Sequence, residues 1–106
     1  MSHVSTHVLD TATGRPAAGV PVTLEGAYGV LATGSTDADG RITELGPDRL
    51  EPATYRLRFD TGRYAVDTGT SSFFPEVVVA FAVHDAAHLH VPLLLSPFGY
   101  STYRGS

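Results

Sequence analysis

Two pairs of histidines stand out among the side chains that could do chemistry. His88 and His90 lie two positions apart in one short stretch, and His3 and His7 lie near the start of the sequence. Imidazoles that share one face of a sheet can converge on zinc, but an H-x-H pair with no acidic residue in the same stretch is a weak metal signal. We therefore predict no metal site. The pattern alone leaves open that these histidines lie on the surface or at an interface and have no catalytic or metal-binding role.

General acid–base catalysis is a second use for these histidines. The pKa of an imidazole is about 6.5, close to neutral pH, so the ring can pass protons to and from a water molecule. Such a site would need an anchor for carbonyl oxygens, and arginine offers a rigid fork of donors. Arg41, directly after a TDADG turn, and Arg104, near the end of the sequence, are the best placed. A solvated arginine after a hairpin turn remains the alternative for Arg41.

Covalent catalysis has little support in the sequence. A G-x-S-x-G motif, which would place a serine nucleophile on a sharp turn, is absent because GTSSF and GYSTY both break the spacing. The sequence contains neither cysteine nor lysine, which excludes thiolate nucleophiles, Schiff bases and cysteine-based zinc sites. Proton transfer to and from water is the chemistry that remains.

The length and net charge of the chain indicate how many domains it forms and which classes of partner it could bind. A chain of 106 residues with a formal net charge of −4 is expected to form one domain, spanning residues 1–106. Its seven arginines are scattered without a basic stripe, so nucleic acid and anionic membranes are not expected partners. No signal-like or membrane-spanning apolar run is present, and we expect a soluble, cytoplasmic protein.

Short β-branched stretches separated by glycine, proline and aspartate recur about every ten residues, a spacing typical of β-sandwiches and barrels. We predict a mainly β protein, a small β-sandwich with one short helix. The helix is expected at residues 61–68, capped by Asp60 or Thr61 and ended by Gly69. The predicted strands cover residues 3–9, 20–25, 30–36, 41–44, 54–60, 73–83, 88–95 and 100–103.

Alternation within two of these strands places the histidines, because residues two apart share a face. The expected core faces consist of Val4, Thr6 and Val8 in the first strand and of Val91, Leu93 and Leu95 near the end. The opposite faces consist of His3, Ser5, His7 and Leu9, and of His88, His90, Pro92 and Leu94. Histidine beside leucine on a non-core face suggests that another subunit or a cleft covers it.

Three stretches carry a family resemblance: THVLDTATGRPA near the start, TDADGRI in the middle and HVPLLLSPFGYSTYRGS at the end. They resemble the signature stretches of the 5-hydroxyisourate hydrolases, the transthyretin-related enzymes of urate degradation in purine metabolism. The resemblance covers essentially the whole chain. It implies a transthyretin-like two-sheet sandwich of seven to eight strands, assembled as a homotetramer, a dimer of dimers with active sites in a central channel.

The resemblance also implies a reaction and its residues. The six-membered ring of 5-hydroxyisourate would open by hydrolysis at its N1–C6 amide bond, giving 2-oxo-4-hydroxy-4-carboxy-5-ureidoimidazoline without metal or cofactor. The implied catalytic residues are His7, Arg41, His90 and Ser106. His7, Arg41, Tyr103 and Arg104 are expected to contact the substrate. One histidine would activate water, with Ser106 orienting one of the pair; the sequence leaves open which histidine is the base.

Two alternative functions of the same fold are considered beside the hydrolase. A transthyretin-like carrier would bind a small molecule or hormone in the same channel, but carriers lack the terminal YRGS and replace the channel histidines and arginine. A catalytically idle scaffold of the same fold is the other. For the hydrolase, we expect the tail to lie at a subunit interface, with the stop at Ser106 leaving room for substrate.

Overall fold

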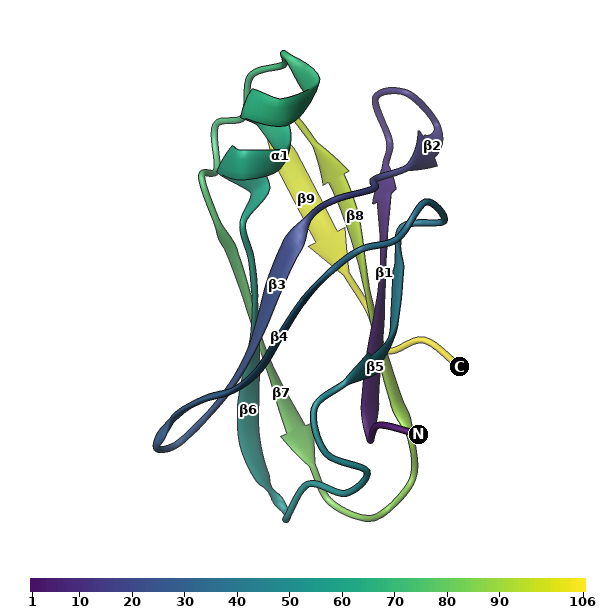
Figure 1. Cartoon of the computed structure of the whole chain (residues 1–106), viewed down its shortest axis with the longest axis vertical. Helices are drawn as coiled ribbons and strands as arrows, with labels where there is room; N and C mark the ends of the chain where they lie inside the picture. Colours follow the sequence, from purple (N-terminus) through teal and green to yellow (C-terminus); the bar gives the residue numbers. More distant parts are fainter.

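Two β-sheets face each other in the computed structural model, which describes all residues 1–106, and a short helix lies at one end of them (Figure 1). The elements in chain order are β1 (Val4–Asp10), β2 (Arg15–Pro16), β3 (Pro21–Gly26), β4 (Gly29–Ser35), β5 (Arg41–Leu45), β6 (Ala53–Phe59), α1 (Thr61–Thr68), β7 (Val77–Val83), β8 (Leu89–Ser96) and β9 (Gly99–Thr102).

The first sheet, here called the β1 sheet, has the order β2-β1-β8-β9, with β5 also paired to β1. The second, the β3 sheet, has the order β4-β3-β6-β7. The predicted mainly β, two-sheet sandwich with one helix is therefore confirmed. The structure has nine strands instead of seven or eight, because Arg15 and Pro16, expected in a turn, pair with Asp10 and Leu9 at the end of β1.

The predicted strand at residues 73–83 begins four residues too early. The structure starts β7 at Val77. The preceding backbone bonds to the first turn of the helix instead: the Thr61 hydroxyl donates to the carbonyl oxygen of Phe74, and the Gly62 N–H donates to that of Pro75 at 2.8 Å. Pro75 also lacks the N–H that a strand pairing would use.

The core lies between the two sheets and follows the predicted alternation. The first strand contributes Val4, Thr6 and Val8, and β8 contributes Val91, Leu93 and Leu95, all buried.

His3 was predicted on the non-core face of the first strand, and this prediction is wrong, because His3 is buried with only 2% of its surface exposed. Its Nδ1 accepts from the Leu50 N–H at 2.8 Å and its Nε2 lies 3.0 Å from the Ala87 carbonyl oxygen. Both ring nitrogens of His3 therefore serve the fold.

The helix α1 forms at the predicted residues 61–68 because both ends are capped. The Asp60 side chain accepts from the Arg63 N–H at 2.9 Å, and Gly69 ends the helix in the left-handed conformation with φ 68°. This eight-residue helix is the only one, and no helix of the structure is long and apolar enough to cross a membrane. The cytoplasmic location stays a prediction.

One side-chain contact ties the helix to the β1 sheet. The Tyr64 hydroxyl donates to Asp10 Oδ2 at 2.8 Å. Partial burial, together with the hydrogen bond to Asp10 and its negative charge, raises the pKa of Tyr64 to about 12. The phenol therefore stays protonated and keeps donating across the physiological range.

Replacing Tyr64 with Phe removes this donor. We expect the free energy of unfolding to fall by about 1.5–3 kcal/mol, as for hydrogen bonds to charged acceptors, in urea titrations at fixed protein concentration. Tyr28→Phe is the matched control because Tyr28 is fully exposed. Equal stability of the two variants would show that the Tyr64 contact does not secure the helix.

Candidate active site

The central strand β1 assembles the candidate site through its two pairings. It runs antiparallel to β5, which places Arg41 opposite His7, and parallel to β8, which places His90 opposite Ser5. Directly paired residues share a face of a sheet. These four side chains therefore share the face turned away from the β3 sheet, here called the outer face.

The turn before β5 fixes the position of Arg41. The Asp37 carboxylate accepts from the backbone N–H of Arg41 at 3.0 Å, and the Val8 N–H donates to the Gly40 carbonyl oxygen at 2.7 Å. Gly40 has φ 75°, and a Cβ there would lie 2.5 Å from the Val8 carbonyl oxygen. Only glycine allows so close an approach, so the predicted turn is what places Arg41 beside β1.

A pocket of about 190 Å³ lies on the outer face, and no hydrophobic residue lines it. Its lining consists of Ser5, Thr6, Arg41, Thr43, His88, His90 and Ser106. We call it the polar pocket. It brings together Arg41, His90 and Ser106 of the predicted site residues. His7 does not line it but lies next to it, opposite Arg41.

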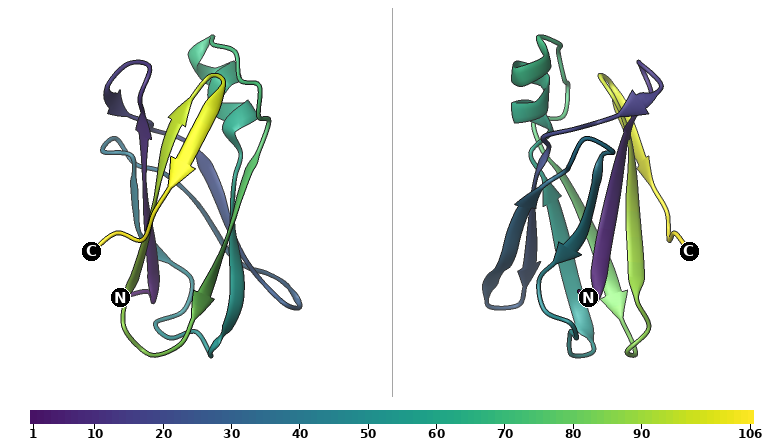
Figure 2. Two further views of the ribbon diagram at one scale, coloured as in Figure 1. Left: turned by 180° about the vertical axis from the view of Figure 1, so that it is seen from behind. Right: turned by 45° about the vertical axis from the view of Figure 1, so that its right-hand side comes forward.

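Figure 2 shows the segment after β9 crossing the outer face of the β1 sheet. Ser106, at the end of this segment, lines the polar pocket. The Gly105 N–H donates to the His90 carbonyl oxygen at 2.8 Å. A Cβ at Gly105 would lie 2.5 Å from Cδ2 of the His90 ring, so glycine lets the backbone pass against the imidazole. Sequence reasoning did not single out Gly105, although it lies within the quoted YRGS motif.

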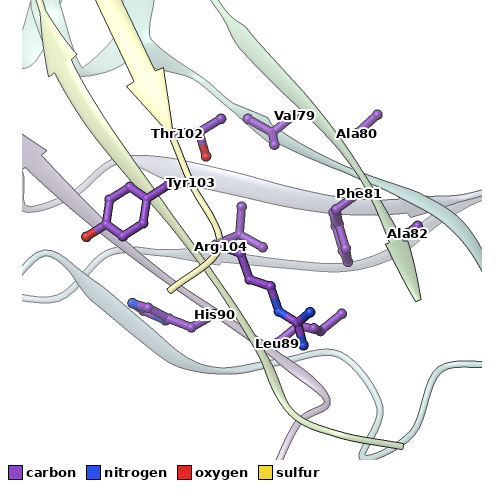
Figure 3. Close-up of a pocket in the computed structure, with 10 residues that line it drawn as sticks. Val79, Ala80, Phe81, Ala82, Leu89, His90, Thr102, Tyr103 and Arg104 are labelled. Carbon is purple, nitrogen blue, oxygen red and sulfur yellow. The ribbon is translucent and has the colours of Figure 1, made fainter. Parts of the chain in front are cut away.

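Tyr103 and Arg104 line a different pocket of about 290 Å³, which is largely apolar and lies beside β7, β8 and β9. We call it the apolar pocket, and it shares His90 with the polar pocket. Figure 3 shows the Tyr103 ring and the His90 imidazole on one side of β8, with Arg104 extending to the other side toward Leu89. Within one chain, Arg104 and Arg41 thus line different pockets.

The surroundings of His90 disfavour the protonated form of its imidazole. Partial burial is the largest influence, and positive charge on Arg41, His7 and His88 acts in the same direction, so that the pKa of His90 lies below its ordinary value. A lowered pKa means that the neutral imidazole persists to more acidic pH. His90 is therefore a base that is unprotonated at neutral pH.

The hydroxyl that contacts His90 comes from Ser5. Ser5 Oγ lies 2.9 Å from His90 Nδ1 and 2.8 Å from His88 Nε2. Sequence reasoning expected Ser106 to orient a histidine and assigned no role to Ser5. The alternation of β1 had placed Ser5 on the correct face, but the pairing of β1 with β8 was not visible in the sequence.

The arrangement suits the activation of water next to a carbonyl group. His90 supplies a neutral base, and Arg41 supplies donors to an oxygen that gains negative charge. The chain contains no group of three or more His, Cys, Asp or Glu side chains arranged to hold a metal ion.

Comparisons with known proteins find relatives that match this chain in both sequence and fold. A sequence model of the HIUase/Transthyretin family matches residues 4–105. The 5-hydroxyisourate hydrolase of Salmonella dublin is 49% identical over 109 residues, an alignment covering 97% of this chain and 80% of the relative. The solved structure of Klebsiella pneumoniae 5-hydroxyisourate hydrolase is similar with a TM-score of 0.91 and 41% identity, covering 97% of this chain and 98% of that one.

Transthyretin from Sparus aurata has the same fold, with a TM-score of 0.88 and 33% identity over 99% of this chain and 97% of that one. Among these three relatives, the two hydrolases are thus more similar to this chain in sequence than the transthyretin is.

The lowered pKa of His90 gives a test that needs no substrate. In an NMR titration of the imidazoles, His90 should take up its proton below the ordinary histidine pKa of about 6.5. Arg41→Gln should move the pKa of His90 upward because it removes a neighbouring positive charge. An unchanged midpoint in Arg41→Gln would show that the guanidinium does not act on His90.

Proposed function

The chain belongs to the HIUase/transthyretin family, and on this premise we propose that it hydrolyses 5-hydroxyisourate to 2-oxo-4-hydroxy-4-carboxy-5-ureidoimidazoline. The observation that carries the proposal is the polar pocket, where a neutral imidazole and a guanidinium face the same space. Its polar lining suits a small heterocycle rich in carbonyl and N–H groups, and the site needs no cofactor for the chemistry described below.

We propose His90 as the general base. Its Nε2 takes a proton from a water molecule while the water oxygen attacks carbon C6 of the substrate. Arg41 donates to the C6 oxygen as this oxygen gains negative charge. The N1–C6 bond then breaks, the His90 imidazolium returns its proton to N1, and the ring opens to a carboxylic acid, which releases its remaining proton to solvent and becomes a carboxylate. Histidine is unchanged at the end, so one water is consumed for each substrate.

The other predicted residues have supporting roles in this scheme. His7 lies opposite Arg41 and would bind the substrate beside the guanidinium as the second imidazole of the site. Ser106 lines the polar pocket and would contact the attacking water or the substrate. Tyr103 and Arg104 line the apolar pocket, so we propose that they contact substrate or a neighbouring subunit at the rim of the site.

We also propose the homotetramer, a dimer of dimers, that the resemblance implies. The strands β7 and β9 each form one edge of their sheet, and the apolar pocket lies beside both. Unpaired strand edges are templates for pairing with another chain. Large aromatic side chains are exposed on and beside β9, with Phe98 at 78% and Tyr100 at 43% exposure. Burying them between subunits would remove apolar surface from water.

Analytical ultracentrifugation tests the assembly. We expect a particle of four times the 11.2 kDa chain mass. Tyr100→Glu should weaken this assembly by placing a charge on the edge strand, whereas Tyr28→Glu, in the turn between β3 and β4, should not. A monomer at micromolar concentration would contradict the proposal.

The activity is tested with substrate generated in situ from urate by urate oxidase, followed by its ultraviolet absorbance. The protein should accelerate decay far beyond the spontaneous background. His90→Ala should reduce turnover by at least about a hundredfold, the lower range for a general base, while the assembly is unchanged. His84→Ala is the control because His84 is exposed and lines neither the polar nor the apolar pocket.

Decay at the background rate by the correctly assembled wild-type protein would leave a carrier or an idle scaffold as the function. Full activity of His90→Ala would instead keep the hydrolase and remove His90 as its base.

A further inference from the structure

A serine links the proposed base, His90, to a second histidine, His88, and the mechanism above gives no role to this serine or to His88. His88 Nδ1 lies 3.0 Å from the Ser2 carbonyl oxygen. His88 Nε2 lies 2.8 Å from Ser5 Oγ, and Ser5 Oγ lies 2.9 Å from His90 Nδ1. The chain therefore runs from a backbone carbonyl through two side chains, His88 and Ser5, to the proposed base, His90.

The chemistry of these groups fixes the direction of every hydrogen bond when His88 is uncharged. A carbonyl oxygen only accepts, so His88 Nδ1 carries the proton and His88 Nε2 is an acceptor. The single hydroxyl proton of Ser5 must then point to His88 Nε2. Ser5 Oγ can therefore only accept from the other side, which requires a proton on His90 Nδ1.

The first group in this chain is firmly held. Ser2 is 3% exposed, its N–H donates to Glu44 Oε2 at 2.8 Å, and its hydroxyl oxygen accepts from the Leu45 N–H at 2.9 Å. Ser5, in the middle, lines the polar pocket but is only 9% exposed, which limits the access of water to its two hydrogen bonds. A carbonyl in a fixed position gives the chain of hydrogen bonds a fixed polarity.

We infer that Ser5 and His88 are positioning residues, which hold His90 in the tautomer with a proton on Nδ1 and a free lone pair on Nε2. This inference rests on the proposed hydrolase function. The lone pair on Nε2 is the one that accepts the proton of the attacking water. An isolated neutral imidazole would exchange between both tautomers and both ring orientations, so only part of the population could act as the base.

Variants on the two positioning residues have distinguishable effects. Ser5→Ala removes the acceptor, so both tautomers of His90 become populated. His88→Leu leaves the Ser5 hydroxyl free to donate to His90 Nδ1, which favours a proton on Nε2 and blocks the base. We expect kcat to fall by about tenfold in Ser5→Ala, less than the roughly hundredfold cost of a misplaced catalytic group, because part of the population keeps the active tautomer. The loss should be larger in His88→Leu, with KM little changed.

Two matched variants separate positioning from general damage. Ser5→Thr keeps the hydroxyl and should restore most of kcat. Ser35→Ala removes an exposed serine at the end of β4 and should leave kcat unchanged. A Ser5→Ala protein with full kcat, or a Ser5→Thr protein as slow as Ser5→Ala, would overturn the positioning role of this hydroxyl.

The tautomer itself is measured by ¹⁵N NMR of the imidazole nitrogens at neutral pH, in wild type and without substrate. We expect His90 with a protonated Nδ1 and a bare Nε2 in wild type, and a mixture in Ser5→Ala. A wild-type His90 protonated on Nε2 overturns the inference, whether or not the variants fold. Because the spectrum needs no turnover, an inactive protein with the expected tautomer would count against the proposed function and not against this inference.

Discussion

The register of β1 between β5 and β8 is the constraint on which the rest of the site depends. One pairing sets Arg41 beside His7, and the other sets His90 beside Ser5. A shift of one residue in either pairing would turn the β1 side chains of the site toward the core, because side chains alternate along a strand. The buried residues Val4 and Val8, on the opposite face of β1, make such a shift costly. The apolar core thus holds the polar site in register.

Arg41 has two effects that work together in the proposed reaction. Its positive charge helps to keep the pKa of His90 low, so that the imidazole is neutral and ready to accept a proton. The same charge would stabilise the oxygen that becomes negative when water attacks the carbonyl. The hydrogen bond that His90 Nδ1 would donate to Ser5 adds direction to this arrangement, because it would leave Nε2 as the free ring nitrogen. Charge and tautomer would together make one imidazole a base at neutral pH.

The sequence predicted the local features of this protein well. Alternation placed His7 and His90 on outer faces, and the capping residues gave α1 its correct bounds. Errors came from contacts between distant segments. His3 fits the outer-face pattern, yet both of its ring nitrogens form hydrogen bonds with the backbone of distant residues, Leu50 and Ala87. The early start assigned to β7 failed for a similar reason, since the carbonyl of Pro75 bonds to the helix.

Long-range pairing also explains why part of the site was missed. Ser5 and His90 are 85 residues apart in sequence, and only the parallel pairing of β1 with β8 brings them into contact. No pattern within either strand indicates that contact. The residues alone suggested histidine acid–base chemistry with Arg41 or Arg104 as an anchor, whereas the full set of His7, Arg41, His90, Ser106, Tyr103 and Arg104 came from the family resemblance; their roles remain proposals. The structure adds the common pocket that three of them line.

The central claim is that the polar pocket is where the substrate binds and reacts. A crystal structure of the assembled protein with bound urate, the stable precursor of the substrate, tests it most directly. The account predicts urate in the polar pocket, with a carbonyl oxygen within hydrogen-bonding distance of the Arg41 guanidinium and the ring beside His90 Nε2. Urate bound only in the apolar pocket, next to Phe81 and Arg104 and without contact to Arg41, would contradict it.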